Sequence, residues 1–181
     1  MKYTTQLLFC CSIMVFGCKK NAAIPPEVIN TNSIEAQVNI TGRAPRTHSV
    51  KGETAVFSSY VDENQNRIIS IWGYDGIFSL KLDFTNIDTG TYSFMETYNS
   101  GKTGGGLTYI EGTFFSSLLY FTTFETDTLG NNISRSTGSF TINKLNDTEI
   151  EGTMNAVLIN GDGIECHISN AVFKGGIVKQ Y

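Results

Sequence analysis

Hydrophobic and polar residues alternate with a period of two along two stretches of the chain, residues 33–40 and residues 78–84. In both stretches every even-numbered position is apolar and every odd-numbered position is polar or charged. Successive side chains of a β-strand point to opposite faces, so this period indicates one buried and one exposed face. We therefore predict a half-buried strand in each stretch.

Further strand signals follow along the chain, separated by turn sequences. Residues 62–66 (DENQN) suit a hairpin loop, and residues 160–163 (NGDG) predict a tight turn because glycine and asparagine tolerate positive φ. The other predicted strands are residues 55–61, 67–72, 90–94, 107–110, 113–125, 134–145, 149–159 and 164–173. With about ten strands and no helical pattern, we expect an all-β fold, either an antiparallel β-sandwich or a partly closed β-barrel.

The first residues of the chain have the layout of a bacterial export signal. Lys2 supplies a positive charge, and residues 7–15 form an apolar run that is too short to span a bilayer. The sequence Val15-Phe16-Gly17-Cys18 follows and resembles the lipobox of bacterial lipoproteins, in which a small residue precedes the lipid-modified cysteine. The resemblance implies a signal peptide over residues 1–17 and lipid attachment at Cys18.

The other cysteines fit this interpretation. Cys10 follows Phe9 and Cys11 follows Cys10, so neither has the small preceding residue that processing requires. Once Cys18 carries lipid, Cys166 has no partner for an intramolecular disulfide, and stability must come from packing.

The resemblance to lipoproteins also predicts the organisation and location of the chain. Residues 18–32, which contain Pro25-Pro26, would link the lipid to one all-β domain over residues 33–181. The two or three acyl chains of the lipoprotein pathway would hold this domain stably at a membrane. Lys19-Lys20 stand where surface-displayed lipoproteins of Bacteroidota often carry acidic residues, which favours the periplasmic side of the outer membrane and leaves surface exposure as the alternative.

The C-terminal half carries a second, weaker resemblance. Residues 138–142 (GSFTI), 150–154 (IEGTM) and 168–173 (ISNAVF) form a strand, turn and strand unit followed by a closing strand. Together they resemble small, uncharacterised β-rich lipoproteins of Bacteroidota over about residues 90–175. That resemblance implies no activity.

Composition and motifs argue against several functions. Thirteen basic and 17 acidic residues give a net charge of −4, without the clustered Lys and Arg that nucleic-acid binding requires. Residues 100–106 (SGKTGGG) contain Gly-Lys-Thr, but Glu96 stands where a phosphate-binding loop needs glycine, so we predict a flexible surface loop. Glu165 and His167 share one strand face but are too few to bind zinc, and Cys166 faces the apolar side as an inert residue. We predict no metal site and no cofactor.

Aromatic residues provide the only candidate binding surface. Trp72 and Tyr74 belong to the sequence Trp72-Gly73-Tyr74-Asp75-Gly76, where large rings beside a glycine turn can lie exposed at a sheet edge. We predict a ligand-binding role for these two residues, with ordinary packing as the alternative. The other aromatic candidates are Tyr60, Tyr92, Tyr98, Tyr109 and Tyr120.

These observations favour a non-catalytic binding or interaction module of the bacterial envelope, with a glycan, a lipid or an envelope protein as its ligand. We predict no catalytic residues. One alternative is an envelope glycan hydrolase that uses paired carboxylates from Asp62, Asp75, Asp83 and Asp162. The other alternative is a purely structural component of the envelope.

Overall fold

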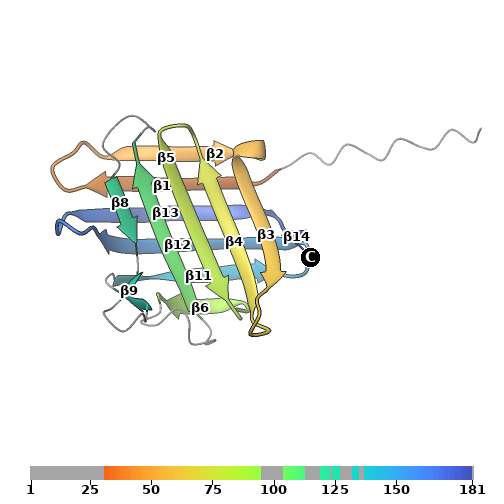
Figure 1. Ribbon diagram of the computed structural model, residues 1–181. Helices are drawn as coiled ribbons and strands as arrows, with labels where there is room; N and C mark the ends of the chain where they lie inside the picture. Colours follow the sequence, from red (N-terminus) through yellow and green to blue (C-terminus); the bar gives the residue numbers. More distant parts are fainter. Residues whose placement is uncertain are drawn as a thin grey trace, which may run out of the picture.

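The structure is a computed structural model and describes residues 31–94, 104–112, 119–122, 124–126, 132–134 and 137–180 (Figure 1). Within these residues the regular structure is β-strand apart from one short 3-10 turn, η1 (Gly52–Thr54). The all-β prediction is confirmed.

The strands form two layers that cross steeply in Figure 1. The front layer contains, in spatial order, β14 (Val178–Lys179), β3 (Ala55–Val61), β4 (Arg67–Tyr74), β5 (Phe78–Thr85), β7 (Gly104–Glu111) and β8 (Leu119–Thr122). The back layer contains β6 (Gly90–Ser93), β11 (Thr137–Leu145), β12 (Glu149–Ile159), β13 (Glu165–Gly176), β1 (Ser33–Ile40) and β2 (Arg46–Lys51). The sandwich alternative is the one that the structure shows.

One strand pairing joins the two layers. Ile159 of β12 pairs with Thr122 of β8, so hydrogen bonding continues from one layer into the other at that corner. A separate two-stranded ribbon consists of β9 (Phe124–Thr126) and β10 (Asn132–Ser134). The prediction of one strand over residues 113–125 is therefore wrong: β8 and β9 pair with different partners, and residues 113–118 lie outside the described part.

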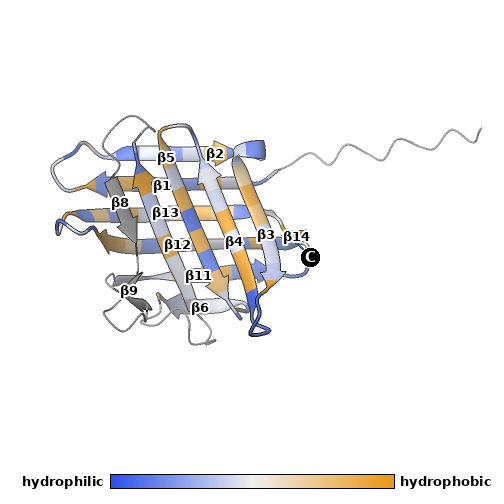
Figure 2. Cartoon of the chain, in the orientation of Figure 1, coloured by the Kyte–Doolittle hydropathy of each residue, from blue (hydrophilic) through white to orange (hydrophobic). Residues whose placement is uncertain are grey.

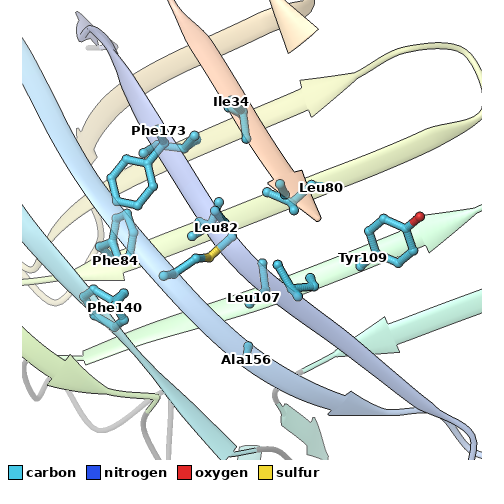
Figure 3. Packing of buried hydrophobic residues seen from close by; sticks show 14 of the residues in the cluster. Ile34, Leu80, Leu82, Phe84, Leu107, Tyr109, Phe140, Ala156 and Phe173 are labelled. Atoms are coloured by element: carbon cyan, nitrogen blue, oxygen red, sulfur yellow. The ribbon is translucent and has the colours of Figure 1, made fainter. Parts of the chain in front are cut away.

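The two layers pack their apolar faces against each other. Figure 3 shows Leu80, Leu82 and Phe84 of β5 facing residues of the back layer, among them Ile34 and Phe173. The Phe84 ring centroid lies 4.7 Å from that of Phe140 and 5.7 Å from that of Phe173, within the range of favourable aromatic contacts. The alternation predicted for residues 33–40 and 78–84 places one face of each strand in this core, as β1 and β5 show.

Turn sequences behave as their composition predicts. The Asn160 side-chain oxygen accepts hydrogen bonds from the backbone N–H groups of Asp162 and Ile164, and Gly163 has a φ of +76°. In the β3–β4 loop, the Asp62 carboxylate accepts hydrogen bonds from the N–H groups of Asn64 and Asn66. Figure 2 shows that this loop is strongly hydrophilic. Both predicted turns are confirmed.

Substitution of Gly152 in β12 tests how closely the core is packed. A Cβ at this position would meet the Phe173 ring and would lie 2.5 Å from the Thr141 carbonyl oxygen. We expect Gly152→Ala to lower the free energy of unfolding by about 1–3 kcal/mol, because a strand backbone must shift to make room. Denaturant titration followed by circular dichroism measures this change.

Gly161→Ala is the matched control, because a Cβ there would have nothing within 4 Å. Its free energy of unfolding is expected to stay within about 0.5 kcal/mol of the parent value. Equal stability of the Gly152→Ala variant and the parent would contradict the close packing described above.

Candidate functional site

Trp72 and Tyr74 point away from the core because Gly73 between them points into it. A Cβ on Gly73 would lie 2.7 Å from Val50 Cγ2 and 2.8 Å from Ile34 Cδ1, so β4 approaches the back layer closely at this point. The alternation of the strand then directs both aromatic rings outward. Each of the two residues is 43% exposed. The structure thus places both predicted binding residues at the surface.

The two rings are held in a defined arrangement. Their planes are nearly parallel, at 16°, and their centroids lie 6.0 Å apart. The indole N–H of Trp72 donates a 2.7 Å hydrogen bond to Ser79 Oγ on the neighbouring strand β5. This bond fixes the indole against the sheet, so that the pair forms an ordered aromatic surface.

Three more exposed hydrophobic residues lie on the same outer face. Val56 of β3 pairs directly with Trp72, and Tyr60 lies farther along the same face of β3. Val178 of β14 pairs with Ser58, which lies between Val56 and Tyr60 on that face. We call these five residues the outer strip: Val56, Tyr60, Trp72, Tyr74 and Val178. Exposed side chains of this size gathered on one face are typical of an interaction surface.

The polar groups beside the outer strip are engaged with one another. Lys81 lies directly opposite Trp72 on β5, and its ammonium group is 2.9 Å from a carboxylate oxygen of Asp83. The carboxylate is mostly buried, whereas the lysine is half exposed. The ion pair neutralises both charges, so this part of the face offers mainly apolar area.

The outer face of the back layer has a different character. Its strands carry ion pairs between neighbouring side chains, and Val172 is an isolated exposed hydrophobic residue on β13. These pairs are Lys51–Glu35 and Lys174–Glu151, and His167 Nε2 lies within hydrogen-bond distance of Glu165 on the same face. The two outer faces of the sandwich therefore differ in chemistry: one is charged and the other carries the outer strip.

A buried polar cluster lies at one end of the core and joins the two layers. Tyr109 Oη donates to Glu111 Oε2 and contacts His48 Nε2, both at 3.1 Å. Glu111 Oε1 accepts hydrogen bonds from Arg43 and Arg46, at 2.9 and 2.8 Å. The tyrosine and glutamate come from β7 and the histidine and Arg46 from β2, so the cluster connects the front layer to the back layer.

Burial controls the protonation of this cluster. Desolvation lowers the pKa of His48, although the carboxylates of Asp75 and Glu111 act in the opposite direction. Desolvation also raises the pKa of Tyr109, so its hydroxyl keeps its proton and donates to Glu111. Asp75 Oδ2 lies 3.8 Å from His48 Nδ1, and Asp75 Oδ1 accepts from two backbone N–H groups of its own turn. The contacts are thus directed within the protein, which is typical of a structural role.

The four carboxylates of the hydrolase alternative occupy separate positions. Asp62 and Asp75 lie at opposite ends of β4, roughly 25 Å apart for a strand of this length. Asp83 lies on the outer face of β5, and Asp162 lies in the β12–β13 turn. Asp62 and Asp75 both bind backbone N–H groups of their own loops. Their geometry provides no pair that faces one bond of a substrate.

Several other sequence candidates also have defined places, whereas Tyr98 lies outside the described residues. Cys166 is buried, and desolvation raises the pKa of its thiol to about 12, which agrees with an inert core residue. Glu165 and His167 share an outer face, 2.9 Å apart, and no set of three metal-ligating side chains occurs among the described residues. The loop predicted over residues 100–106 is wrong at its end, because Gly104–Gly106 belong to β7, and residues 100–103 lie outside the described part. Gly105 lies in a strand because its missing side chain leaves room for the Phe140 ring.

Cys18 and the rest of the predicted signal peptide lie outside the described residues. No helix among the residues that the structure describes is long and apolar enough to cross a membrane. Comparison of the chain with protein-family models, curated proteins and solved structures returned no match.

The lowered pKa of His48 predicts that acid destabilises the fold. In the unfolded chain His48 takes up a proton near pH 6.5, whereas in the folded protein it does so only at lower pH. The free energy of unfolding should therefore fall as the pH drops below about 6.5, by at most about 1.4 kcal/mol per pH unit. Urea titrations between pH 8 and pH 5 measure this slope.

Two variants distinguish the contribution of His48 to this pH slope from the contributions of other titrating groups. We expect His48→Gln to remove most of the slope above the range where carboxylates titrate. His167→Gln, which changes an exposed histidine on the outer face of the same layer, should keep it. An unchanged slope in His48→Gln would show that the buried histidine is not the cause.

Proposed function

We propose that the chain is a lipoprotein of the bacterial outer membrane, anchored through lipid on Cys18, whose domain is a non-catalytic binding module. The outer strip is the observation that carries this proposal. An ordered pair of aromatic rings, flanked by aliphatic side chains on a sheet face, has the composition that interaction surfaces favour. The fold does not require these rings, because their positions face away from the core.

The anchor is supported by the sequence alone. The apolar run over residues 7–15 and the Gly17-Cys18 pair fit an export signal processed at a lipid-modified cysteine. Lys19-Lys20 support a domain that faces the periplasm. An anchored module needs only modest affinity for a ligand on the same envelope, because the tether keeps its local concentration high.

The first experiment tests the anchor. We expect Cys18→Ser to move the protein from the membrane fraction to the soluble fraction of its host, since no acyl chain can then be attached. Cys11→Ser, which leaves Gly17-Cys18 intact, should remain in the membrane fraction. Mass spectrometry of the native N-terminus should find a diacyl or triacyl cysteine, and an unmodified Cys18 would exclude the proposed anchor.

The second experiment tests the binding surface. Trp72→Ala and Tyr74→Ala are each expected to weaken retention on envelope lipids or glycans by about 5- to 100-fold, because each removes a large apolar contact worth about 1–3 kcal/mol. Quantitative pull-down of the unlipidated Cys18→Ser form with vesicles and with immobilised envelope glycans measures the loss, because no acyl chain then holds the protein to lipid.

Val172→Ala is the matched control, because Val172 is 44% exposed but lies on the opposite outer face. It should bind as the parent protein does. Loss of retention in the control, or none in the two aromatic variants, would argue against the outer strip as the binding surface.

A further inference from the structure

We propose that the outer strip lies against the lipid bilayer that holds the Cys18 anchor, so that the domain rests on the membrane through the outer face of β3, β4 and β14. This inference rests on the proposed anchor and names the ligand of the binding module as the interfacial region of a bilayer. It concerns the orientation of the domain, which the anchor by itself does not determine.

The linker enters the domain beside the start of β3. The Asn32 side chain donates to the Ala55 carbonyl oxygen, and the Asn32 carbonyl oxygen accepts from the Gly52 N–H. Ala55 is the first residue of β3 and pairs with Gly73, which lies between the two aromatic residues of the outer strip. Figure 1 shows the beginnings of β1 and β3 at the same corner of the sandwich. The linker therefore joins the domain about one strand away from Trp72 and Tyr74.

The length of the linker limits how far the domain can lie from the lipid. Residues 19–30 separate the lipid-bearing cysteine from the described part and can span at most about 40 Å when extended. That length lets the attachment corner lie at the bilayer and limits its distance from the lipid to about 40 Å. Because the attachment corner adjoins the outer strip, the strip can meet the lipid surface without any rearrangement of the fold.

The residue types of the outer strip are those that suit a membrane interface. Tryptophan and tyrosine are enriched at membrane interfaces, where an apolar ring with one polar atom contacts both lipid and water. The outer strip contains Trp72, Tyr74 and Tyr60, accompanied by Val56 and Val178. The Lys81–Asp83 ion pair beside Trp72 leaves no uncompensated charge at this edge of the strip. The charged outer face of the back layer would then face the aqueous side.

A lipid surface fits the outer strip better than a sugar does. A sugar ring stacked on an aromatic ring also needs hydrogen-bond partners for its hydroxyl groups. Two of the nearest polar groups already have partners: Ser79 Oγ accepts from the Trp72 indole, and Asp83 Oδ2 pairs with Lys81. The aliphatic members of the strip offer no hydrogen bonds, whereas lipid requires none.

The chain contains one tryptophan, so its fluorescence reports on the outer strip directly. The experiment reconstitutes the native lipid-modified protein into vesicles of phosphatidylethanolamine and phosphatidylglycerol, with or without bromine on the acyl chains. We expect bromine to lower Trp72 emission at least about twofold, and emission in unbrominated vesicles to shift to shorter wavelength, because interfacial side chains reach about 5–10 Å into the boundary.

A double variant, Trp72→Phe with Val172→Trp, moves the single tryptophan to the opposite outer face. The parent residues are exposed to almost the same extent, 43% and 44%. The variant should float with the vesicles, and bromine should leave its emission unchanged. Its thermal unfolding curve, compared with that of the parent, verifies that it folds.

The outcomes distinguish this inference from the proposed anchor. If the parent protein floats with the vesicles but bromine does not change its emission, the anchor stands and the proposed orientation is wrong. A response of Trp72 to soluble envelope glycan fragments, without quenching by bromine, would assign the strip to sugar and also overturn the inference. If the native protein does not float with vesicles at all, the anchor fails and the inference fails with it.

Discussion

Each strand of this sandwich buries mainly one of its two faces, and the inner faces of two crossed layers must fit together. Phe84, Phe140 and Phe173 fill this space where side chains are large. Gly73 and Gly152 occupy points where backbone and side chains approach too closely for a Cβ. Because the inner positions alone satisfy the demand for a core, apolar residues on the outer faces need a separate explanation.

The two outer faces of the sandwich differ in chemistry, and this difference suggests a role for the exposed apolar residues. Ion pairs cover the back layer, whereas the front layer carries an ordered Trp72–Tyr74 pair with aliphatic neighbours. The buried cluster around Glu111 holds the layers together at one end and directs its contacts inward. The molecule thus separates stability, which resides between the layers, from interaction, which we assign to one outer face near the linker.

Much of this fold could be predicted from the chain, and the exceptions have physical reasons. Strict alternation identified β1 and β5. Trp72 and Tyr74 are exposed as predicted, but the expected glycine turn at a sheet edge was wrong, because Gly73 lies within β4, between β3 and β5, and faces the core. Strand β2 was missed because its inward positions include Arg46 and His48, which do not resemble core residues. Glu111 was missed for the same reason, although a charge in phase with Leu107 and Tyr109 is a detectable signal. The approach of β2 to β7 depends on long-range topology, which local patterns do not encode.

The central claim is that one outer face of the sandwich meets the membrane. Hydroxyl-radical footprinting tests it most directly, by comparing the native protein on its own membranes with the unlipidated Cys18→Ser form in solution. The account predicts that Trp72, Tyr74 and Tyr60 are protected on the membrane, while His167 on the opposite face is labelled equally in both states. Equal labelling of the three aromatic residues in the two states, or protection of His167 instead, would contradict it.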